Sequence, residues 1–272
     1  MNIIMAALFL GLLGLLSGIL LSFASKKFEV KVDPKIEEVM QYIPSANCGG
    51  CGYPGCAALA EAIVNNGVSI SLCVAISKRN ADAINKIMGV EKNANDNDPL
   101  ARKAALIRCQ GLNTDEYKNF EYAGVKDCQA AVLLQNGPWK CPHRCLGLGS
   151  CVNACPFDAL KMGPNNLPVV DEAKCVACGK CVDACPKQII ELVPQIKTVH
   201  VLCVSKDTGK DTIKMCKIGC IGCGICKKNC PADAIVIENN LAKINYEKCI
   251  DCGKCVEVCP RKSIIKESHQ DT

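Results

Sequence analysis

The segment CVACGKCVDACP at residues 175–186 sets the architecture of this chain, because it occurs again as CIDCGKCVEVCP at residues 249–260. A related pair of segments precedes these two, CLGLGSCVNACP at 145–156 and CIGCGICKKNCP at 220–231. The matching cysteines stand 75 and then 74 residues apart: Cys128, Cys141, Cys145, Cys151, Cys155, Cys175, Cys178, Cys181 and Cys185 recur as Cys203, Cys216, Cys220, Cys226, Cys230, Cys249, Cys252, Cys255 and Cys259. So long a register identifies a duplicated unit.

Three of the four segments have the spacing C-x2-C-x2-C-x3-C-P, which is the ligand run of bacterial two-cluster ferredoxins. In such a module three close cysteines bind one [4Fe–4S] cubane, and the fourth binds the partner cubane. The proline fixes φ as the chain leaves the cluster. Glycines at 179, 222, 224 and 253 allow the backbone to approach the sulfurs. Disulfides and zinc ribbons are the alternatives, and four near-copies of one run disfavour both.

One ligand of this pattern is missing, because Leu148 stands where the second unit has Cys223. Three cubanes have complete sets: Cys155 with Cys175, Cys178 and Cys181; Cys230 with Cys249, Cys252 and Cys255; Cys259 with Cys220, Cys223 and Cys226. A fourth holds Cys145, Cys151 and Cys185, and we expect Cys141 or Cys109 to complete it. Cys203 and Cys216 would then share a further cubane with Cys128 and the other of those two cysteines.

A separate cysteine group precedes the duplicated block, with the spacing Cys48-x2-Cys51-x4-Cys56-x16-Cys73. Three cysteines in a glycine-rich loop, a helix and a returning fourth cysteine suit one cubane, although this spacing alone also allows zinc. With this group, the 24 cysteines suffice for six [4Fe–4S] clusters, and the ferredoxin runs account for four of them.

The composition fits several small modules better than one large hydrophobic core. The chain has 272 residues and 24 Cys, but only 5 Phe, 5 Tyr and 1 Trp. Clusters would replace much of the side-chain core, and their thiolates require a reducing compartment. The formal charge of +5 counts every cysteine as neutral. Twenty-four thiolates add 24 negative charges and six oxidised cores return about 12 positive ones, so the sum is about −7. With this charge, the formal value no longer supports nucleic acid as a partner.

An apolar run from Ile3 to Ala24 is long enough to span a bilayer. The triplet Ser22-Phe23-Ala24 resembles a signal-peptidase site, but no basic residue precedes the run and its apolar core is long for a signal peptide. Lysines at 26, 27 and 31 follow it, so the positive-inside rule places the rest of the chain in the cytoplasm. We therefore expect a single-pass anchor in the cell membrane, in contact with lipid.

The predicted fold class is α+β, with a transmembrane helix (1–25), a four-cysteine [4Fe–4S] domain (26–95) and a bridge with extra cysteines (96–140). Two tandem ferredoxin-like units (141–195 and 196–272) follow. Helices are expected at 33–42, 57–65 and 81–88, the last two ended by glycine, and residues 91–98 read as a linker. Within the units, Asn165-Asn166 and Asn239-Asn240 mark hairpins. The segment ARKAALIRC, 101–109, is compatible with either strand or helix.

No catalytic residues are expected in this chain. It contains no dinucleotide-binding G-x-G-x-x-G after a strand, no Walker loop and no Ser/His/Asp set. His143, His200 and His269 lie near cysteines or in the tail, where surface or packing roles are expected. Without a flavin or nucleotide site, the sequence indicates a relay of single electrons.

The apolar anchor, the phrase NCGGCGYPGC at 47–56 and the phrase CLGLGSCVNACPFDAL at 145–160 together resemble the B subunit of the Rnf complex in its longer clostridial form. The resemblance implies that Cys48, Cys51, Cys56 and Cys73 bind one [4Fe–4S] cluster. It also implies a membrane-anchored subunit that takes electrons from reduced soluble ferredoxin and relays them, with other Rnf subunits as partners, to NAD+ while Na+ or H+ is translocated. A polyferredoxin subunit of another membrane complex (hydrogenase or formate-linked) and a zinc-binding interaction module are the alternatives.

Overall fold

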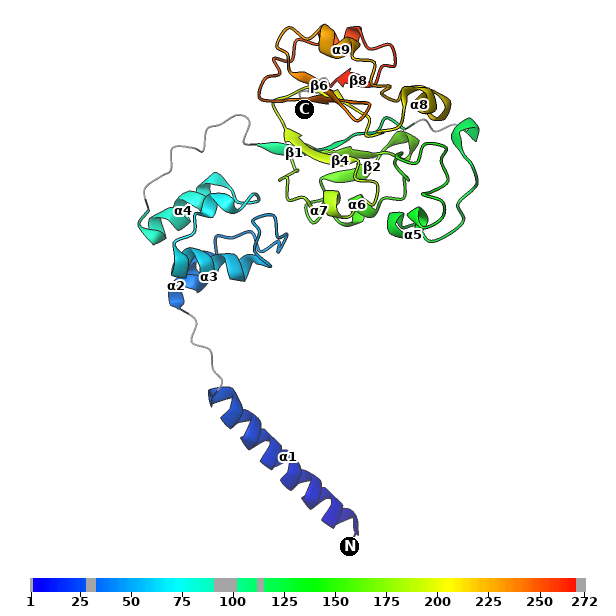
Figure 1. Ribbon diagram of the computed structural model, residues 1–272. Coiled ribbons are helices and arrows are strands. Elements are labelled where there is room, and N and C mark those ends of the chain that lie inside the picture. The colour runs from blue at the N-terminus through cyan, green and yellow to red at the C-terminus, as the bar shows by residue number, and fades with distance from the viewer. Residues whose placement is uncertain (1, 28–32, 91–101, 112–114, 268–272) are drawn as a thin grey trace.

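The structure is a computed structural model that describes the chain except for residues 1, 28–32, 91–101, 112–114 and 268–272 (Figure 1). It combines a long N-terminal helix, a small helical module and two units of short strands and helices. This mixture confirms the predicted α+β class. The expected linker at 91–98 and the end of the tail, with His269, lie outside the described residues.

Helix α1 (Asn2–Lys27) contains the predicted anchor. Its segment Ala7–Lys27 is long and apolar enough to cross a membrane, and none of the apolar window is buried within the chain. Leucines such as Leu8 and Leu20 are about two-thirds exposed. Lys26 and Lys27 occupy the last turn, where the negative end of the helix dipole stabilises cations. An apolar helix left uncovered by the rest of the chain fits a lipid environment.

The N-terminal module consists of three helices and a short 3-10 turn: α2 (Pro34–Met40), α3 (Cys56–Asn66), η1 (Ile70–Leu72) and α4 (Lys78–Met88). Its core is formed by Val39, Leu59, Ile63 and Ile84, all almost fully buried. The expected glycine stops are confirmed, because α3 and α4 each end at a glycine in the left-handed conformation. The helix predicted from residue 81 begins earlier, at Lys78, where the Ser77 hydroxyl caps it.

The first ferredoxin-like unit is built on two antiparallel strand pairs. Strand β1 (Lys103–Ile107) pairs with β4 (Ile190–Pro194), and β2 (Leu160–Met162) pairs with β3 (Pro168–Val170). Its helical elements are η2 (Asp115–Tyr117), α5 (Cys128–Val132), α6 (Ser150–Asn153), η3 (Pro164–Asn166) and α7 (Lys180–Asp183). The segment that the sequence left undecided between strand and helix is therefore strand, and it supplies one edge of this unit.

The second unit repeats this arrangement. Strand β5 (Val199–Val201) pairs with β8 (Ile264–Lys266), and β6 (Ile235–Glu238) pairs with β7 (Leu241–Ile244). Its helices are α8 (Gly209–Met215), α9 (Ile225–Lys228) and α10 (Lys254–Glu257). In each unit the first strand pairs with the last, so the two ends of the unit meet and enclose the cysteine loops between them.

Both predicted hairpins are present, and each has a glycine pressed against its tip. Asn165, Asn166, Asn239 and Asn240 all have positive φ. Asn239 and Asn240 form a two-residue turn between β6 and β7, whereas Asn165 and Asn166 lie in η3, within the longer loop between β2 and β3. A Cβ on Gly147 would lie 2.8 Å from the Asn166 carbonyl oxygen, and one on Gly222 would lie 2.7 Å from that of Asn240. Both glycines also have positive φ. Only glycine satisfies the backbone angle and the close approach together.

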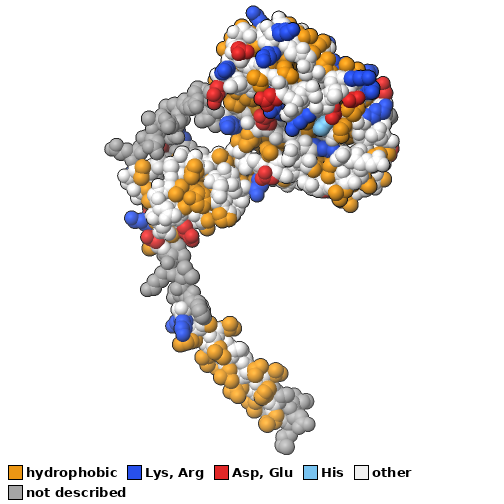
Figure 2. All heavy atoms as spheres, in the orientation of Figure 1, with side chains coloured by type: hydrophobic (Ala, Val, Ile, Leu, Met, Phe, Trp, Pro, Cys, Tyr) orange, Lys and Arg blue, Asp and Glu red, His pale blue; other side chains and the backbone are white. Residues whose placement is uncertain are grey.

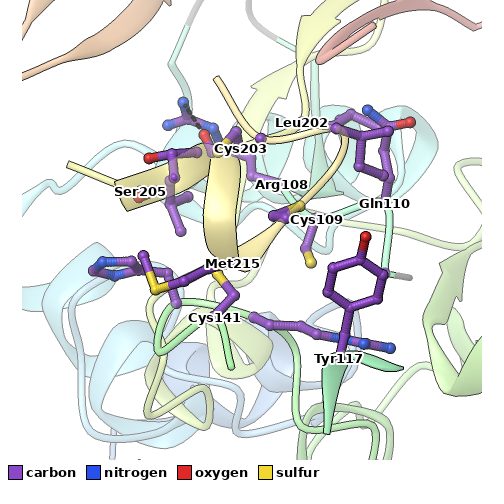
Figure 3. A pocket seen from close by; sticks show the side chains of 17 residues that line it. Arg108, Cys109, Gln110, Tyr117, Cys141, Leu202, Cys203, Ser205 and Met215 are labelled. Carbon is purple, nitrogen blue, oxygen red and sulfur yellow. Dashed lines mark hydrogen bonds between the residues drawn. The ribbon is translucent and has the colours of Figure 1, made fainter. Parts of the chain in front are cut away.

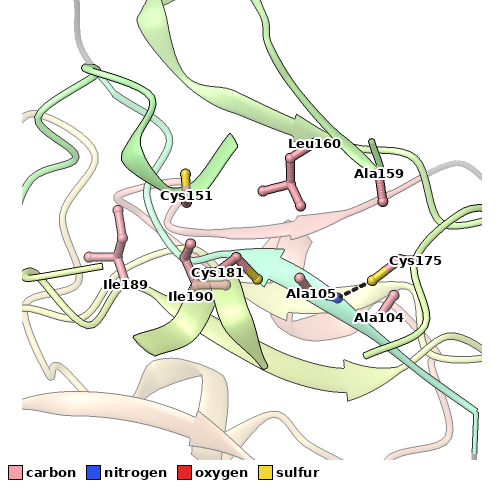
Figure 4. Packing of buried hydrophobic residues seen from close by; sticks show 9 residues of the cluster. All are labelled: Ala104, Ala105, Cys151, Ala159, Leu160, Cys175, Cys181, Ile189 and Ile190. Atoms are coloured by element: carbon pink, nitrogen blue, oxygen red, sulfur yellow. Dashed lines mark hydrogen bonds between the residues drawn. The ribbon is translucent and has the colours of Figure 1, made fainter. Parts of the chain in front are cut away.

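The core of each unit is small and contains cysteines. In the first unit Ala104, Ala105, Leu160 and Ile189 pack with Cys151, Cys175 and Cys181 (Figure 4). The core of the second unit also combines aliphatic residues with cysteines, with Ile235 and Leu241 beside Cys220, Cys226 and Cys255. These cores agree with the scarcity of aromatic residues, because the space between the strand pairs is lined by sulfur as well as by aliphatic groups.

Polar contacts join the two units. The Arg108 guanidinium donates to the Glu191 carboxylate at 2.8 Å and to the Cys203 carbonyl of the second unit at 3.0 Å. The His143 ring lies 3.1 Å from the Asp207 carboxylate across the same boundary. These contacts hold the cysteines at the boundary in one arrangement.

Candidate iron–sulfur centres

The four cysteines of the N-terminal module lie close to one another. Cys56 begins α3 and Cys73 directly follows η1. Burial raises the pKa of the Cys73 thiol, and the charges of Cys51, Cys48 and Cys56 raise it further. The Asn47 side-chain oxygen accepts from the Cys56 N–H at 2.9 Å and ties the loop to the helix. The structure thus brings together the set that the sequence proposed for one cluster.

A common local structure presents the cysteine at the third ligand position of each ferredoxin run. Each of the short helices α6, α7, α9 and α10 follows a glycine at its N-cap with φ between 74° and 81°. The second residue of each helix stands at the third ligand position of its run, and all four of these cysteines are buried: Cys151, Cys181, Cys226 and Cys255. The left-handed glycine turns the chain sharply enough to direct this cysteine inward.

The three complete ferredoxin sets form as expected. One pocket is lined by Cys230, Cys249, Cys252 and Cys255, and another by Cys220, Cys223, Cys226 and Cys259. The third set is Cys155, Cys175, Cys178 and Cys181. Burial raises the pKa of Cys181, and the charges of Cys175 and Cys178, then of Cys151 in the neighbouring set and of Cys155, raise it further. The Ala105 N–H donates to the Cys175 sulfur at 3.4 Å (Figure 4), and the Ala234 N–H does so to Cys230 at 3.4 Å.

The fourth ferredoxin set differs from the expectation. Its pocket is lined by Cys128, Cys145, Cys151 and Cys185, so the prediction that Cys141 or Cys109 would complete this set is wrong. Hydrogen bonds explain the position of Cys128. The Ser150 hydroxyl donates to the Asp127 carboxylate at 2.9 Å and accepts from the Cys128 N–H at 2.8 Å. These bonds join the start of α5 to the start of α6, next to Cys151.

Leu148 has an apolar role in this altered site. It packs on the small cluster of Ala131, Trp139 and Leu146, together with Cys128. Leu148 therefore helps to hold α5, the helix that carries Cys128. Cys128 supplies the ligand that is missing at position 148. No pattern in the sequence signals this exchange, because twenty residues separate Cys128 from Leu148.

The remaining four cysteines meet at the boundary between the units. Cys109, Cys141, Cys203 and Cys216 line one pocket together with Arg108 and Arg144, and Figure 3 shows Cys109, Cys141 and Cys203 around it. Two come from each unit, as expected, but Cys109 takes the place predicted for Cys128. Cys109 stands two residues after β1, and Cys203 stands two residues after β5. Strand pairing, not the offset of 75 residues, makes these two cysteines equivalent.

Arg144 supplies a buried positive charge between the fourth set and the boundary set. Its side chain is only 6% exposed, and its guanidinium carbon lies 3.4 Å from the centre of the Trp139 ring. Burial lowers the pKa of Arg144, while the charges of Cys109 and Cys145, one from each set, raise it. A fixed cation here offsets the negative charge of both sets, which favours reduction of any cluster they hold.

The raised pKa values of most of these thiols fit cysteines that ionise when they bind iron. Burial, followed by charge from neighbouring cysteines, raises the pKa of Cys141, Cys145 and Cys181 to about 12 and that of Cys151, Cys226 and Cys255 to about 11. These groups need bound iron to become thiolates near neutral pH. Cys259 differs. Burial opposes its ionisation, but hydrogen bonds from Ser263 and the Arg261 backbone lower its pKa overall.

The shape of the sites also fits a cubane. Within the described residues, no three His, Cys, Asp or Glu side chains converge as a single metal ion requires. The cysteine sets instead line pockets, as four-iron clusters with a thiolate at each corner need.

The histidines in the described part of the chain have packing or surface contacts. His200 is buried, its Nε2–H donates to the Lys197 carbonyl at 2.9 Å, and its Nδ1 accepts from the Tyr246 hydroxyl at 2.9 Å. His143 pairs with Asp207 across the boundary between the units. A packing role for His200 is as predicted.

Comparison with known families agrees with these sets. A family model described as "Putative Fe-S cluster" matches residues 43–75. Models described as "4Fe-4S dicluster domain" match residues 139–190 and 219–264, and also 174–234. Together with the cysteine pockets, these matches define the protein as a multi-cluster [4Fe–4S] iron–sulfur protein.

Similar proteins place it more narrowly. The chain is 43% identical to the B subunit of the ion-translocating oxidoreductase complex of Methanosarcina acetivorans, over 87% of this chain and 88% of that protein. It is also 43% identical to the B subunit of the proton-translocating ferredoxin:NAD(+) oxidoreductase complex of Clostridium ljungdahlii, over 90% and 84%. The Na(+)-translocating counterpart of Acetobacterium woodii is 44% identical, over 88% and 70%. The chain belongs to the family of B subunits of ion-translocating oxidoreductase complexes, the Rnf family that its sequence resembles.

Proposed function

We propose that this chain is the electron-input subunit of an Rnf-type complex, which accepts electrons from reduced ferredoxin and relays them through six [4Fe–4S] clusters toward NAD+, with Na+ or H+ translocation by other subunits. One observation carries the proposal, namely that four pockets are each lined by four cysteines. The other eight cysteines are the four of the N-terminal module and Cys155, Cys175, Cys178 and Cys181, which supports a grouping of all 24 into six sets. When bound, such clusters supply one-electron chemistry.

The six sets follow one another in a single series. In each link, a cysteine of one set helps to raise the pKa of a cysteine of the next. The links are Cys48 to Cys178, Cys151 to Cys181, Cys109 to Cys145, Cys220 to Cys203 and Cys226 to Cys255. The order therefore runs from the N-terminal module through the first unit and the boundary set to the second unit.

The first link rests on direct contact. A Cβ on Gly50 would lie 3.1 Å from the Cys178 Cα and 3.3 Å from its carbonyl oxygen. Gly50 has no positive φ, so the glycine at this position serves close approach and not an unusual backbone angle. The loop of the N-terminal set is thereby seated directly on a cysteine of the next set.

The membrane side follows from charge. Lys26 and Lys27 end the candidate membrane-spanning segment, and by the positive-inside rule they support a cytoplasmic location of the iron–sulfur modules. That compartment is reducing and supports cluster assembly. It also contains soluble ferredoxin and NAD+, the two partners that the proposed reaction needs.

Two measurements test this function. Anaerobically purified protein should contain about 24 Fe per chain on four-iron stoichiometry, and a brown colour that dithionite bleaches. About 20 Fe would remove the sixth cluster, and a colourless protein would indicate a zinc module. Membranes that lack this chain should lose ferredoxin-dependent NAD+ reduction. Undiminished activity would refute the Rnf assignment and favour another membrane redox complex.

A further inference from the structure

Two cysteines differ from the others in their access to solvent. Among the 24 cysteines, all in the described part of the chain, only Cys223 and Cys252 are exposed. Both belong to the second unit, whereas the N-terminal module contacts the first unit, at Cys178. An external redox partner can approach a cluster most closely where a ligand reaches the surface.

The duplication shows what kind of partner fits at Cys252. Its counterpart in the first unit is Cys178, with an offset of 74 residues. Cys178 is half-buried and lies against the N-terminal module, because the glycine loop around Gly50 sits on its backbone. The first unit thus uses this position to receive another iron–sulfur module. In the second unit the same position is open, and Ile250 beside it is 64% exposed.

The exposed residues close to Cys252 in the sequence include more lysines than carboxylates, which suits an acidic partner. Lys248, Lys254 and Lys266 are exposed here, while Glu247 and Glu257 are the exposed carboxylates of the same segment. The Asp251 carboxylate is engaged within the second unit. It accepts from the Thr198 and Val199 N–H groups at 3.1 Å and lies 3.6 Å from the Lys197 ammonium. Figure 2 shows lysine and arginine side chains spread over the second unit, at the top of the view.

We propose that Lys248, Ile250, Cys252 and Lys254 form the docking surface for a small acidic iron–sulfur protein, the soluble ferredoxin of the proposed function, on which this inference rests. The apolar Ile250 supplies the contact at the centre, and the lysines steer the partner. The partner occupies the second unit as the N-terminal module occupies the first. Electrons therefore enter at the exposed end of the series and leave toward the membrane helix.

The test compares two double charge reversals in the intact membrane complex. Lys248→Glu with Lys254→Glu changes the Cys252 surface, and Lys227→Glu with Lys228→Glu makes the same change in α9, beside the other exposed cysteine. The first variant should raise the KM for reduced ferredoxin about tenfold and weaken its salt dependence. Its iron content and the maximal rate at saturating ferredoxin should stay unchanged. The control variant should retain the wild-type KM.

Three results would overturn the proposal. One is an unchanged KM in the Lys248/Lys254 variant. Another is a raised KM in the control variant alone, which would move the docking surface to Cys223. Loss of other subunits from the purified Lys248/Lys254 complex would show that this surface binds a subunit instead. If the wild-type complex did not oxidise ferredoxin, the proposed function would fail and the docking proposal with it.

Discussion

Pairs of cysteine substitutions can reveal which cysteines share a cluster. Replacing one ligand by alanine should remove one cluster, or about four Fe per chain. Replacing two ligands of the same set should also remove about four Fe per chain. Replacing one ligand in each of two different sets should remove about eight Fe per chain. Iron content therefore reports the grouping directly, without any need for activity.

The structure makes opposite predictions for two such pairs. Cys109 and Cys203 line one pocket, so Cys109→Ala with Cys203→Ala should lose about four Fe. Cys128 lies in a different pocket from Cys203, so Cys128→Ala with Cys203→Ala should lose about eight. The numerical offset of the repeat pairs Cys128 with Cys203 and would give about four for that double variant.

The assay is iron determination on anaerobically purified full-length protein, with EPR of the oxidised and reduced forms. A three-iron remnant has its own EPR signal and is counted with the set from which it came. The matched control is Cys128→Ala with Cys145→Ala, two ligands of one pocket, which should lose about four Fe. A loss of four Fe from the Cys128/Cys203 pair would refute the grouping by strand equivalence.

Three further predictions concern single positions. Gly50→Val would place a Cβ 3.1 Å from the Cys178 Cα, at a cost of about 1–3 kcal/mol, so the N-terminal module should shift away from the first unit. EPR should then show weaker spin–spin coupling between the N-terminal cluster and the cluster of the Cys178 set, at unchanged iron content. Leu148→Cys in a Cys128→Ala background should recover the lost cluster, about four Fe, because it recreates the second-unit pattern; no recovery would contradict the equivalence with Cys223. Ile189→Ala, at a fully buried core position, should lower the free energy of unfolding by about 2–5 kcal/mol, measured by anaerobic denaturation, whereas the exposed Val169→Ala should change it by less than about 0.5 kcal/mol.

Much of the local structure was readable from residue patterns. Spacing identified the ferredoxin runs, asparagine pairs located both hairpins, and glycines marked the ends of α3 and α4. These features depend on backbone angles and short-range contacts within about ten residues, so the linear sequence contains the information they need. The segment from 101 to 109 was undecided, because its strand character depends on pairing with β4, more than eighty residues later.

The residue pattern of this chain therefore established its chemistry: four-iron clusters held by cysteine, a duplicated ferredoxin unit and an apolar anchor. Spacing is sufficient for this because, in the three complete ferredoxin runs, three ligands are neighbours along the chain. The assignment of Cys128 and Cys109 needed the folded chain. Cys128 reaches its set through the Asp127–Ser150 hydrogen bond, and Cys109 reaches the boundary set because β1 is the counterpart of β5. Contacts between distant segments leave no periodic signal in the sequence, so only the packing of the two units shows which cysteines meet.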